Sequence, residues 1–417
     1  MTPDISTLVR VFGRIGVLSF GGPAAQIALM HKELVEDRDW LTEQQFLRAL
    51  SFCMLLPGPE AMQLATYAGW RMRGTLGGLI AGLLFVVPGA LVILGLALGY
   101  AYFGELPWVQ SAFVGIKAAV TIIVLQALYK VAKKALKRPM DWMIAALGFV
   151  GLFALGLPFP LVIAIAAVIG AVNSADEPHA PVEAPMKPRT LATVAIWGLL
   201  WLAPVAACAM MAPAFYTEIA LFFSKLAVVT FGGAYAVLAY MAQEVVQTYG
   251  WITPDQMIDA LGLAETTPGP LILVTEFVAL LAGFAKGGVW MAIAAGGLCL
   301  WVTFVPCFLW IFAGAPYLDL LAAQPRLRGA LSAITAAVVG VILNLSIWFA
   351  AHVFFDSVGT AAFGPFTVLA PLWMSVNLIP VALAVMAAVM LILLKIGMGR
   401  TLLIMAIFGL ASGVYAF

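Results

Sequence analysis

The feature that most constrains this chain is an internal repeat. A shift of 211 positions, the separation of Phe20 from Phe231, brings Ser19–Leu34 (SFGGPAAQIALMHKEL) onto Thr230–Val245 (TFGGAYAVLAYMAQEV). The same shift aligns two Pro-Gly-Pro motifs without a gap, and beyond them the register slips by three. A chance match between apolar segments would not keep tryptophan, proline and glycine in place. The sequence therefore predicts two homologous halves.

The apolar runs of the chain are long enough to cross a lipid bilayer. Hydrophobic residues make up 64% of the 417 positions, charged residues 10%, and the mean hydropathy is +1.07, so lipid is the expected solvent. The clear candidate spans are Leu76–Tyr102, Val109–Tyr129, Leu191–Ala212, Val289–Ala313, Gly329–Ala351 and Leu372–Leu394. Shorter apolar runs cover Trp142–Leu155, Pro160–Val172 and Thr401–Phe417. The predicted fold class is an all-α polytopic membrane protein.

The polar segment 173–189 divides the two halves. We predict a transporter repeat over residues 1–173, a linker with one extra transmembrane helix over 174–213, and a second repeat over 214–417. Six spans in each half plus the extra helix give about 13 transmembrane segments, and the odd number before the second half makes it an inverted repeat. Thirteen Lys and Arg residues then fall on the cytoplasmic side against three outside. The predicted orientation has a cytoplasmic N-terminus and an external C-terminus.

Composition also argues against several classes of protein. The formal net charge of +1 gives no basic surface for nucleic acid. Four cysteines and three histidines show no metal-ligand spacing, and no glycine-rich dinucleotide motif is present, so we predict no metal, no cofactor and no enzyme. The N-terminus lacks a basic region, and Arg10 and Arg14 interrupt the first apolar segment, so no cleavable signal peptide is expected.

The Phe-Gly-Gly and Pro-Gly-Pro motifs predict broken helices. Glycine releases the backbone from helical dihedrals, proline favours the first turn of a new helix, and residues before proline avoid the helical region. Segments 43–56 and 59–70 are each too short to span, so they form either one broken span or a re-entrant hairpin. Paired breaks at membrane depth are typical of secondary transporters, with the site at the repeat interface. New helix starts expose unpaired N–H groups that suit an anion.

The candidate binding residues cluster around these breaks. Arg14 and Lys225 occupy equivalent places six residues before each Gly-Gly, where a cation inside a membrane suggests function. The alternative interpretation is that each reaches an interface or pairs with a nearby acid. The full predicted binding set is Arg14, Ser19, Phe20, Gly21, Gly22, Pro23, Gln26, Pro57, Gly58, Pro59, Gln63, Lys225, Thr230, Phe231, Gly232, Gly233, Thr266, Thr267, Pro268, Gly269 and Pro270.

Three carboxylates near the breaks are candidates for proton coupling. They are Glu60, Glu265 and Glu276, which could carry protons in a site of low dielectric constant. The alternative roles are capping of a helix dipole and pairing with Arg14 or Lys225. Lys117 and Arg48 have no equivalent cation in the other half, and packing or an interfacial position is favoured for both.

With these motifs in place, the chain resembles a known family. FGRIGVLSFGGPAAQIALMHKELV with LLPGPEAMQLATYAGWRMRG, and KLAVVTFGGAYAVLAYMAQEVV with TTPGPLILVTEFVALLAG, are similar to the chromate ion transporter family in its long two-domain form. The resemblance implies export of chromate from the cytoplasm, driven by the proton motive force, chromate resistance, and a relation to sulfate. The second copy departs from the first at Ala234, Val237 and Leu271, which replace Pro23, Gln26 and Glu60.

The same motifs are compatible with other functions. A transporter of sulfate or another oxyanion is the nearest alternative, because chromate and sulfate share shape and charge. A passive anion channel would follow the electrochemical gradient without saturable exchange. A homodimer is a possible assembly. A membrane-embedded chromate reductase would need a redox cofactor for which the sequence shows no motif.

Overall fold

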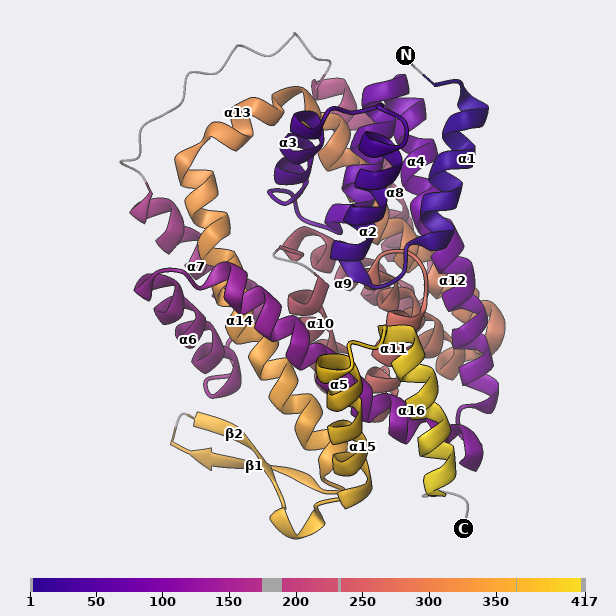
Figure 1. The fold of residues 1–417 in the computed structure, drawn as a ribbon, viewed down its shortest axis with the longest axis vertical. Helices are drawn as coiled ribbons and strands as arrows, with labels where there is room; N and C mark the ends of the chain where they lie inside the picture. The colour runs from indigo at the N-terminus through magenta and orange to yellow at the C-terminus, as the bar shows by residue number, and fades with distance from the viewer. Residues whose placement is uncertain (1–2, 175–189, 232–233, 365, 414–417) are drawn as a thin grey trace. The chain divides into compact units, whose positions relative to one another are not determined.

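The computed structural model describes residues 3–174, 190–231, 234–364 and 366–413, so most of the predicted linker lies outside the described residues. The helices of the first half are α1 (Ile5–Leu18), α2 (Gly22–His31), α3 (Glu43–Cys53), α4 (Glu60–Phe103), α5 (Pro107–Ala135), α6 (Pro139–Phe153) and α7 (Phe159–Asn173) (Figure 1). They are followed by α8 (Thr190–Met211), α9 (Ala214–Val229), α10 (Ala234–Gln243), α11 (Pro254–Thr266), α12 (Val274–Gly314), α13 (Leu318–Ala323), α14 (Pro325–Phe354), α15 (Leu378–Ala388) and α16 (Met398–Ser412).

Several of these helices have the length and composition of membrane spans. Five stretches qualify within the described residues: α4, α5, α8, α14 and the run 271–321 that contains α12. Shorter apolar helices are α6, α7, α16 and the run 378–393 that begins with α15. The predicted extra helix between the halves, Leu191–Ala212, coincides with α8 to within one residue at each end. The prediction of a mainly helical membrane protein is confirmed.

The internal repeat is visible in the local backbone. A single π-helical turn follows α2 (Lys32–Glu36) and α10 (Glu244–Thr248). The N–H of Trp40 then donates to the Leu34 carbonyl at 2.9 Å, and the N–H of Trp251 donates to the Val245 carbonyl at 2.8 Å. The next helix of each half begins with a capping box, because Thr42 and Gln45 exchange the same two hydrogen bonds as Thr253 and Gln256.

The long helices α4 and α12 each contain a reversal at matching positions. Arg73 and Gly74 leave the helical region in α4, as Gly287 and Gly288 do in α12, and Gly74 and Gly288 have positive φ values of 60° and 76°. The separation of 214 between Gly74 and Gly288 agrees with the predicted slip of three residues. Helices that reverse direction must pack backbone against backbone, which is why glycine recurs beside each reversal.

The first Pro-Gly-Pro segment adopts the re-entrant alternative. Helix α3 ends at Cys53, three residues before the predicted end of segment 43–56, residues 54–59 are non-helical, and α4 begins at Glu60. Phe52, at the end of α3, lies with its ring 6.3 Å from that of Tyr67, two turns into α4. A straight broken span would keep these rings much farther apart, since a helix rises about 1.5 Å per residue. The two short helices therefore fold back as a hairpin.

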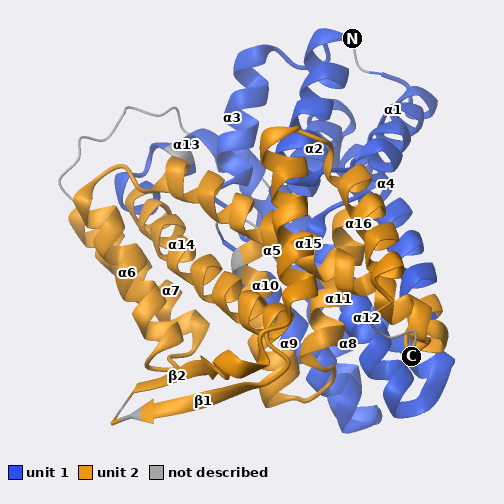
Figure 2. Ribbon diagram, turned by 60° about the horizontal axis from the view of Figure 1, so that its bottom comes forward, with its two compact units in different colours: residues 1–98, 175–234, 267–328 blue, residues 99–174, 235–266, 329–417 orange. Residues whose placement is uncertain are grey.

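The chain forms two compact units, and each combines segments from both halves (Figure 2). Unit 1 comprises residues 1–98, 175–234 and 267–328, and unit 2 comprises 99–174, 235–266 and 329–417. Within unit 1, α12 packs against α8 and α9. Within unit 2, α5 packs against α15 and α16, and a small-residue cluster joins α6, α7 and α14: Ile144, Ala166, Ala333, Ala336 and Ala337. Each long helix of unit 2 therefore packs against the short helices of the other half.

A β-hairpin departs from the all-α prediction. Strands β1 (Val358–Phe363) and β2 (Phe366–Pro371) pair antiparallel, and Gly364 between them has a φ of +62°. The predicted span Leu372–Leu394 begins too early, because helix α15 starts only at Leu378, where the Asn377 side chain accepts a hydrogen bond from the Ile379 N–H. Apolar β-branched and aromatic residues fit a strand as readily as a helix, so hydropathy alone could not separate the two.

His31, at the end of α2 and outside the five candidate spans, predicts a pH-dependent stability. Its Nε2 lies 2.6 Å from a Glu43 oxygen and its Nδ1 lies 3.1 Å from a Glu36 oxygen. The hydrogen bond to Glu43 contributes most to raising the pKa of His31 above its ordinary value. The stabilisation should be fully present below about pH 6.5, the ordinary pKa, and lost as the pH rises through the raised pKa. We expect the difference in melting temperature between the natural protein and His31→Gln to shrink from pH 5.5 to pH 9; a constant difference would contradict this.

Candidate functional site

The helix breaks of the two halves are hydrogen-bonded to each other within unit 1. The N–H of Gly58 donates to the Thr230 carbonyl at 2.8 Å, and the N–H of Gly269 donates to the Ser19 carbonyl at 2.9 Å. Gly58 and Gly269 are equivalent positions of the repeat, and so are Ser19 and Thr230. Each Pro-Gly-Pro break therefore binds the helix end before the Phe-Gly-Gly motif of the other half.

The residues at these breaks form them for local reasons. Helices α1 and α9 end at equivalent positions, where the Ser19 hydroxyl donates to the Ile15 carbonyl and the Thr230 hydroxyl donates to the Leu226 carbonyl, both at 2.6 Å. These bonds satisfy the hydroxyls and leave the carbonyls of the two residues free to accept from the opposite break. Gly58 has a φ of +120°, a backbone conformation that residues other than glycine rarely adopt.

Two buried glutamines hold the breaks in place. The Gln26 amide nitrogen donates to the Gly269 carbonyl at 2.7 Å and to the Ser19 carbonyl at 3.2 Å, so it bridges the two breaks. The Gln63 amide nitrogen donates to the Pro57 carbonyl at 2.7 Å. Both side chains are almost completely buried, and a buried donor that satisfies a non-helical carbonyl stabilises that irregular backbone.

A cavity lies where these elements meet. Its empty space is about 340 Å³ including its open mouth. It is lined by Pro23, Gln26, Gly58, Pro59, Glu60, Ala61, Thr230, Ala234, Pro270, Leu271 and Ile272. The first turns of α2 and α4 are both part of this lining, and the N-cap of α2, Gly21, makes no side-chain capping bond. Pro23 has no N–H, so α2 contributes only the positive end of its dipole, whereas α4 presents the backbone of Glu60 and Ala61 in its first turn, and both features favour an anion.

Among the described residues that line the cavity, one is acidic, Glu60, and none is basic. An ionised carboxylate would repel a bound dianion in a site of low dielectric constant, whereas a protonated carboxyl can donate a hydrogen bond to it. The arrangement therefore favours an anion most when Glu60 carries a proton. Leu271, the equivalent residue of the second half, also lines the cavity but cannot titrate.

The structure brings together only part of the predicted binding set. Pro23, Gln26, Gly58, Pro59, Thr230 and Pro270 line the cavity, and Ser19, Pro57, Gln63 and Gly269 are tied to the breaks that form it. The remaining described members do not line it: Arg14, Phe20, Gly21, Gly22, Lys225, Phe231, Thr266, Thr267 and Pro268. Gly232 and Gly233 lie outside the described residues.

The two predicted cations occupy exposed positions. The Arg14 side chain is 61% exposed, and its Nε lies 3.5 Å from a carboxylate oxygen of Glu33, which is buried and also pairs with Arg38. Lys225 is exposed as well. For Arg14, this geometry agrees with the alternative interpretation of pairing with a nearby acid.

The other two candidate carboxylates also lie outside the cavity lining. Glu265 is buried in unit 2 and accepts a hydrogen bond at 2.6 Å from the hydroxyl of Tyr235, two residues after the second Phe-Gly-Gly motif. Glu276 is buried in unit 1, and its Oε2 has no hydrogen-bond partner among the described residues. Sequence reasoning missed Tyr235, although the signal existed, because Tyr235 replaces Ala24 in the repeat.

Comparisons with known proteins agree with this architecture. The family description "Chromate transporter" matches residues 6–171 and 217–414, which cover both halves. A chromate transport protein of Cupriavidus metallidurans is 31% identical over 82% of this chain and 81% of its own length, and one of Pseudomonas aeruginosa is 31% identical over 79% and 77%. A probable chromate transport protein of Synechococcus elongatus is 29% identical over 81% and 83%. No solved structure matches.

Proposed function

This chain belongs to the chromate transporter family, and from that premise we propose that it is a secondary active transporter that exports chromate from the cytoplasm. The observation that carries the proposal is the cavity formed where the helix breaks of both halves cross, with the starts of α2 and α4 in its lining. A divalent tetrahedral oxyanion placed there would accept hydrogen bonds from the first-turn N–H groups of α4, at Glu60 and Ala61, and would lie near the positive end of α2.

The crossed hydrogen bonds support alternating access as the mechanism. The bonds from Gly58 to Thr230 and from Gly269 to Ser19 tie each break to the opposite half within unit 1, so both breaks would move together with that unit. We propose an inverted repeat with about thirteen spans in the inner membrane, a cytoplasmic N-terminus and an external C-terminus, in which one bundle rocks against the other around the anion. Such a transporter would confer chromate resistance.

The proposal also assigns roles to the charged residues near the helix breaks. Arg14 and Lys225, on exposed helix faces, would attract the dianion towards its route rather than contact it in the cavity. The proton motive force would drive export, with Glu60, Glu265 and Glu276 as candidate proton carriers. Glu60 lines the anion's own cavity, and a proton on it would accompany the anion rather than exchange for it, which suits Glu60 less well to proton-driven export than a carrier outside the cavity.

Competition on the purified protein tests the cargo. In proteoliposomes loaded with unlabelled chromate, we expect saturable uptake of labelled chromate by exchange, which excess sulfate inhibits only weakly. Saturable exchange of sulfate without chromate exchange would support the proposed anion site but would show that chromate is not the transported anion. Flux that follows the gradient without exchange would indicate a passive channel instead. Liposomes without protein provide the background.

A further inference from the structure

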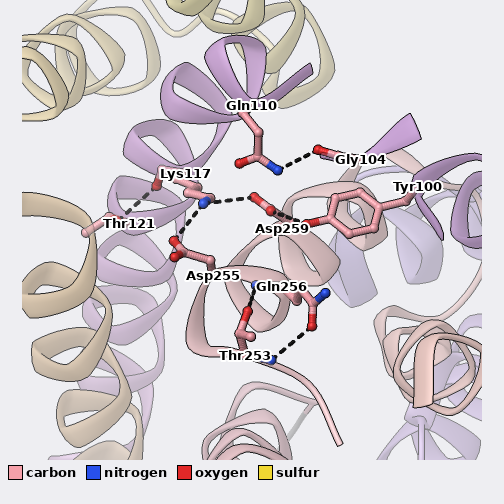
Figure 3. A network of polar contacts seen from close by, with 9 residues as sticks. All are labelled: Tyr100, Gly104, Gln110, Lys117, Thr121, Thr253, Asp255, Gln256 and Asp259. Atoms are coloured by element: carbon pink, nitrogen blue, oxygen red, sulfur yellow. Dashed lines mark hydrogen bonds and ion pairs between the residues drawn. The ribbon is translucent and has the colours of Figure 1, made fainter. Parts of the chain in front are cut away.

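A buried ionic cluster in unit 2 lies outside the cavity described above (Figure 3). The Lys117 ammonium on α5 donates to an Asp255 oxygen at 2.7 Å and lies 3.6 Å from Oδ1 of Asp259, both on α11. The hydroxyl of Tyr100, near the end of α4, donates to Oδ2 of Asp259 at 2.7 Å. Three helices therefore contribute to one polar network within the unit.

The cluster is one proton short of neutrality. Two carboxylates share a single ammonium group, so the ionised set carries one net negative charge. The Asp259 side chain is 0% exposed and Lys117 is 12% exposed, whereas Asp255 is 69% exposed. The exposed Asp255 keeps its charge in water and holds the ammonium at 2.7 Å, closer than the 3.6 Å to Asp259, so the buried Asp259 is the costlier of the two carboxylates to ionise and the one that takes a proton. Oδ1 of Asp259 accepts no hydrogen bond from the described residues, which leaves it as the oxygen that can take the proton.

Polar and charged groups from several helices surround Asp259. They are Tyr100 on α4, Lys117 on α5 and Asp255 on α11. Helix α16, which packs against α5 and α11, has Arg400 near its start as its one charged residue. His352 on α14 acts electrostatically on Asp255. Asp255, which is largely exposed, shares the Lys117 ammonium with the buried Asp259.

The repeat shows that the fold does not require a buried acid at this position. Asp259 aligns with Arg48 of the first half, and Asp255 aligns with Gln44. Arg48 is 58% exposed and approaches Asp319 only to 4.0 Å. Equivalent helices therefore form with an exposed cation at the same position, so the buried carboxylate is a feature added to the second half.

We propose that Asp259, whose partner Lys117 also pairs with the exposed Asp255, is the proton-carrying site that couples transport to the proton gradient. This inference rests on the proposed function and deepens it. The step is a simple protonation: an O–H bond forms on Oδ1 of Asp259 on one side of the membrane and breaks on the other, and nothing is oxidised or reduced. Glu60, Glu265 and Glu276 are the competing carriers.

The experiment compares exchange with gradient-driven accumulation in proteoliposomes. We expect Asp259→Asn to keep chromate-for-chromate exchange, which needs no proton, while accumulation driven by an imposed pH gradient falls at least tenfold. Asp319→Asn, an exposed carboxylate that pairs with the repeat-equivalent Arg48, is the matched control and should accumulate chromate as the natural protein does. The same assay on Glu60→Gln, Glu265→Gln and Glu276→Gln ranks the competitors.

Two outcomes would overturn the inference. One is gradient-driven accumulation by Asp259→Asn at the natural rate, and the other is loss of accumulation in a competitor variant alone. If Asp259→Asn does not fold, Asp259→Glu is the variant to measure. It keeps a titratable carboxyl group but places it in altered surroundings. We expect its accumulation to show a shifted pH midpoint, and an unchanged midpoint would overturn the inference. Failure of the proposed function is distinguishable, since the natural protein would then exchange no chromate.

Discussion

Gly58→Ala is expected to lower chromate transport at least about tenfold, because backbone strain of about 1–3 kcal/mol is enough to displace the break. Gly58 has a φ of +120°, and a Cβ atom there would lie 2.9 Å from the Cys307 sulfur and 2.9 Å from the Gln63 amide nitrogen. Relief of either contact moves the N–H that donates to the Thr230 carbonyl. The loss should appear in initial rates of exchange at equal amounts of inserted protein.

Gly95→Ala is the matched control for this substitution. Gly95 lies within helix α4, and a Cβ atom there would meet nothing within 4 Å. Alanine favours a helix more than glycine does, so transport should stay at the natural level. Equal transport by Gly58→Ala and Gly95→Ala would show that the geometry of the first Pro-Gly-Pro break is not needed for function.

Gln26→Val is expected to weaken chromate exchange by about 10-fold to 100-fold, because the Gly269 carbonyl loses its donor at a cost of about 1–3 kcal/mol, while the Ser19 carbonyl keeps the Gly269 N–H. Gln26 donates to carbonyls from both breaks, those of Ser19 and Gly269. Valine is the residue that the second half has at the equivalent position, Val237, so the substitution removes the hydrogen bonds with a side chain that the repeat already accommodates. The dependence of the exchange rate on chromate concentration measures the effect.

Gln44→Val makes the same chemical change at an exposed position of α3 and should leave exchange close to the natural level. Both variants need to be present in the membrane in equal amounts, which protease protection or fluorescence-detected chromatography establishes. If Gln26→Val exchanges chromate with natural affinity and rate, the bridge between the breaks has no part in transport, and the cavity assignment loses its main support.

The local features of the fold could be predicted because glycine and proline determine them. The break after Leu18, the non-helical segment around Gly58 and the slip of three residues between the halves all follow from short-range backbone preferences. The crossed hydrogen bonds, such as that from Gly58 to Thr230, could not be predicted. They depend on how segments far apart in sequence pack, which no local preference determines.

The positions of the charged side chains could also be predicted only in part. Arg14 was placed near the site by its distance from Gly21 along the chain, but it lies off the buried stripe of α1 formed by Leu8, Val11, Phe12 and Ile15. The helical period of 3.6 residues places Arg14 off that stripe, so its exposure could be predicted from the sequence. Asp259 also had a signal, an acid within an apolar stretch of α11, but its pairing with Lys117 requires the packing of two distant helices.

Chromate flux into inside-out membrane vesicles tests the central claim most directly. With an acid-inside proton gradient, we predict saturable accumulation of chromate that collapses when a protonophore is added and that excess sulfate inhibits weakly. Vesicles from cells without the protein provide the baseline, and Gly58→Ala vesicles should stay near that baseline. Chromate entry that is absent, or that neither saturates nor responds to the gradient, would contradict a secondary active transporter with its anion site at the crossed helix breaks.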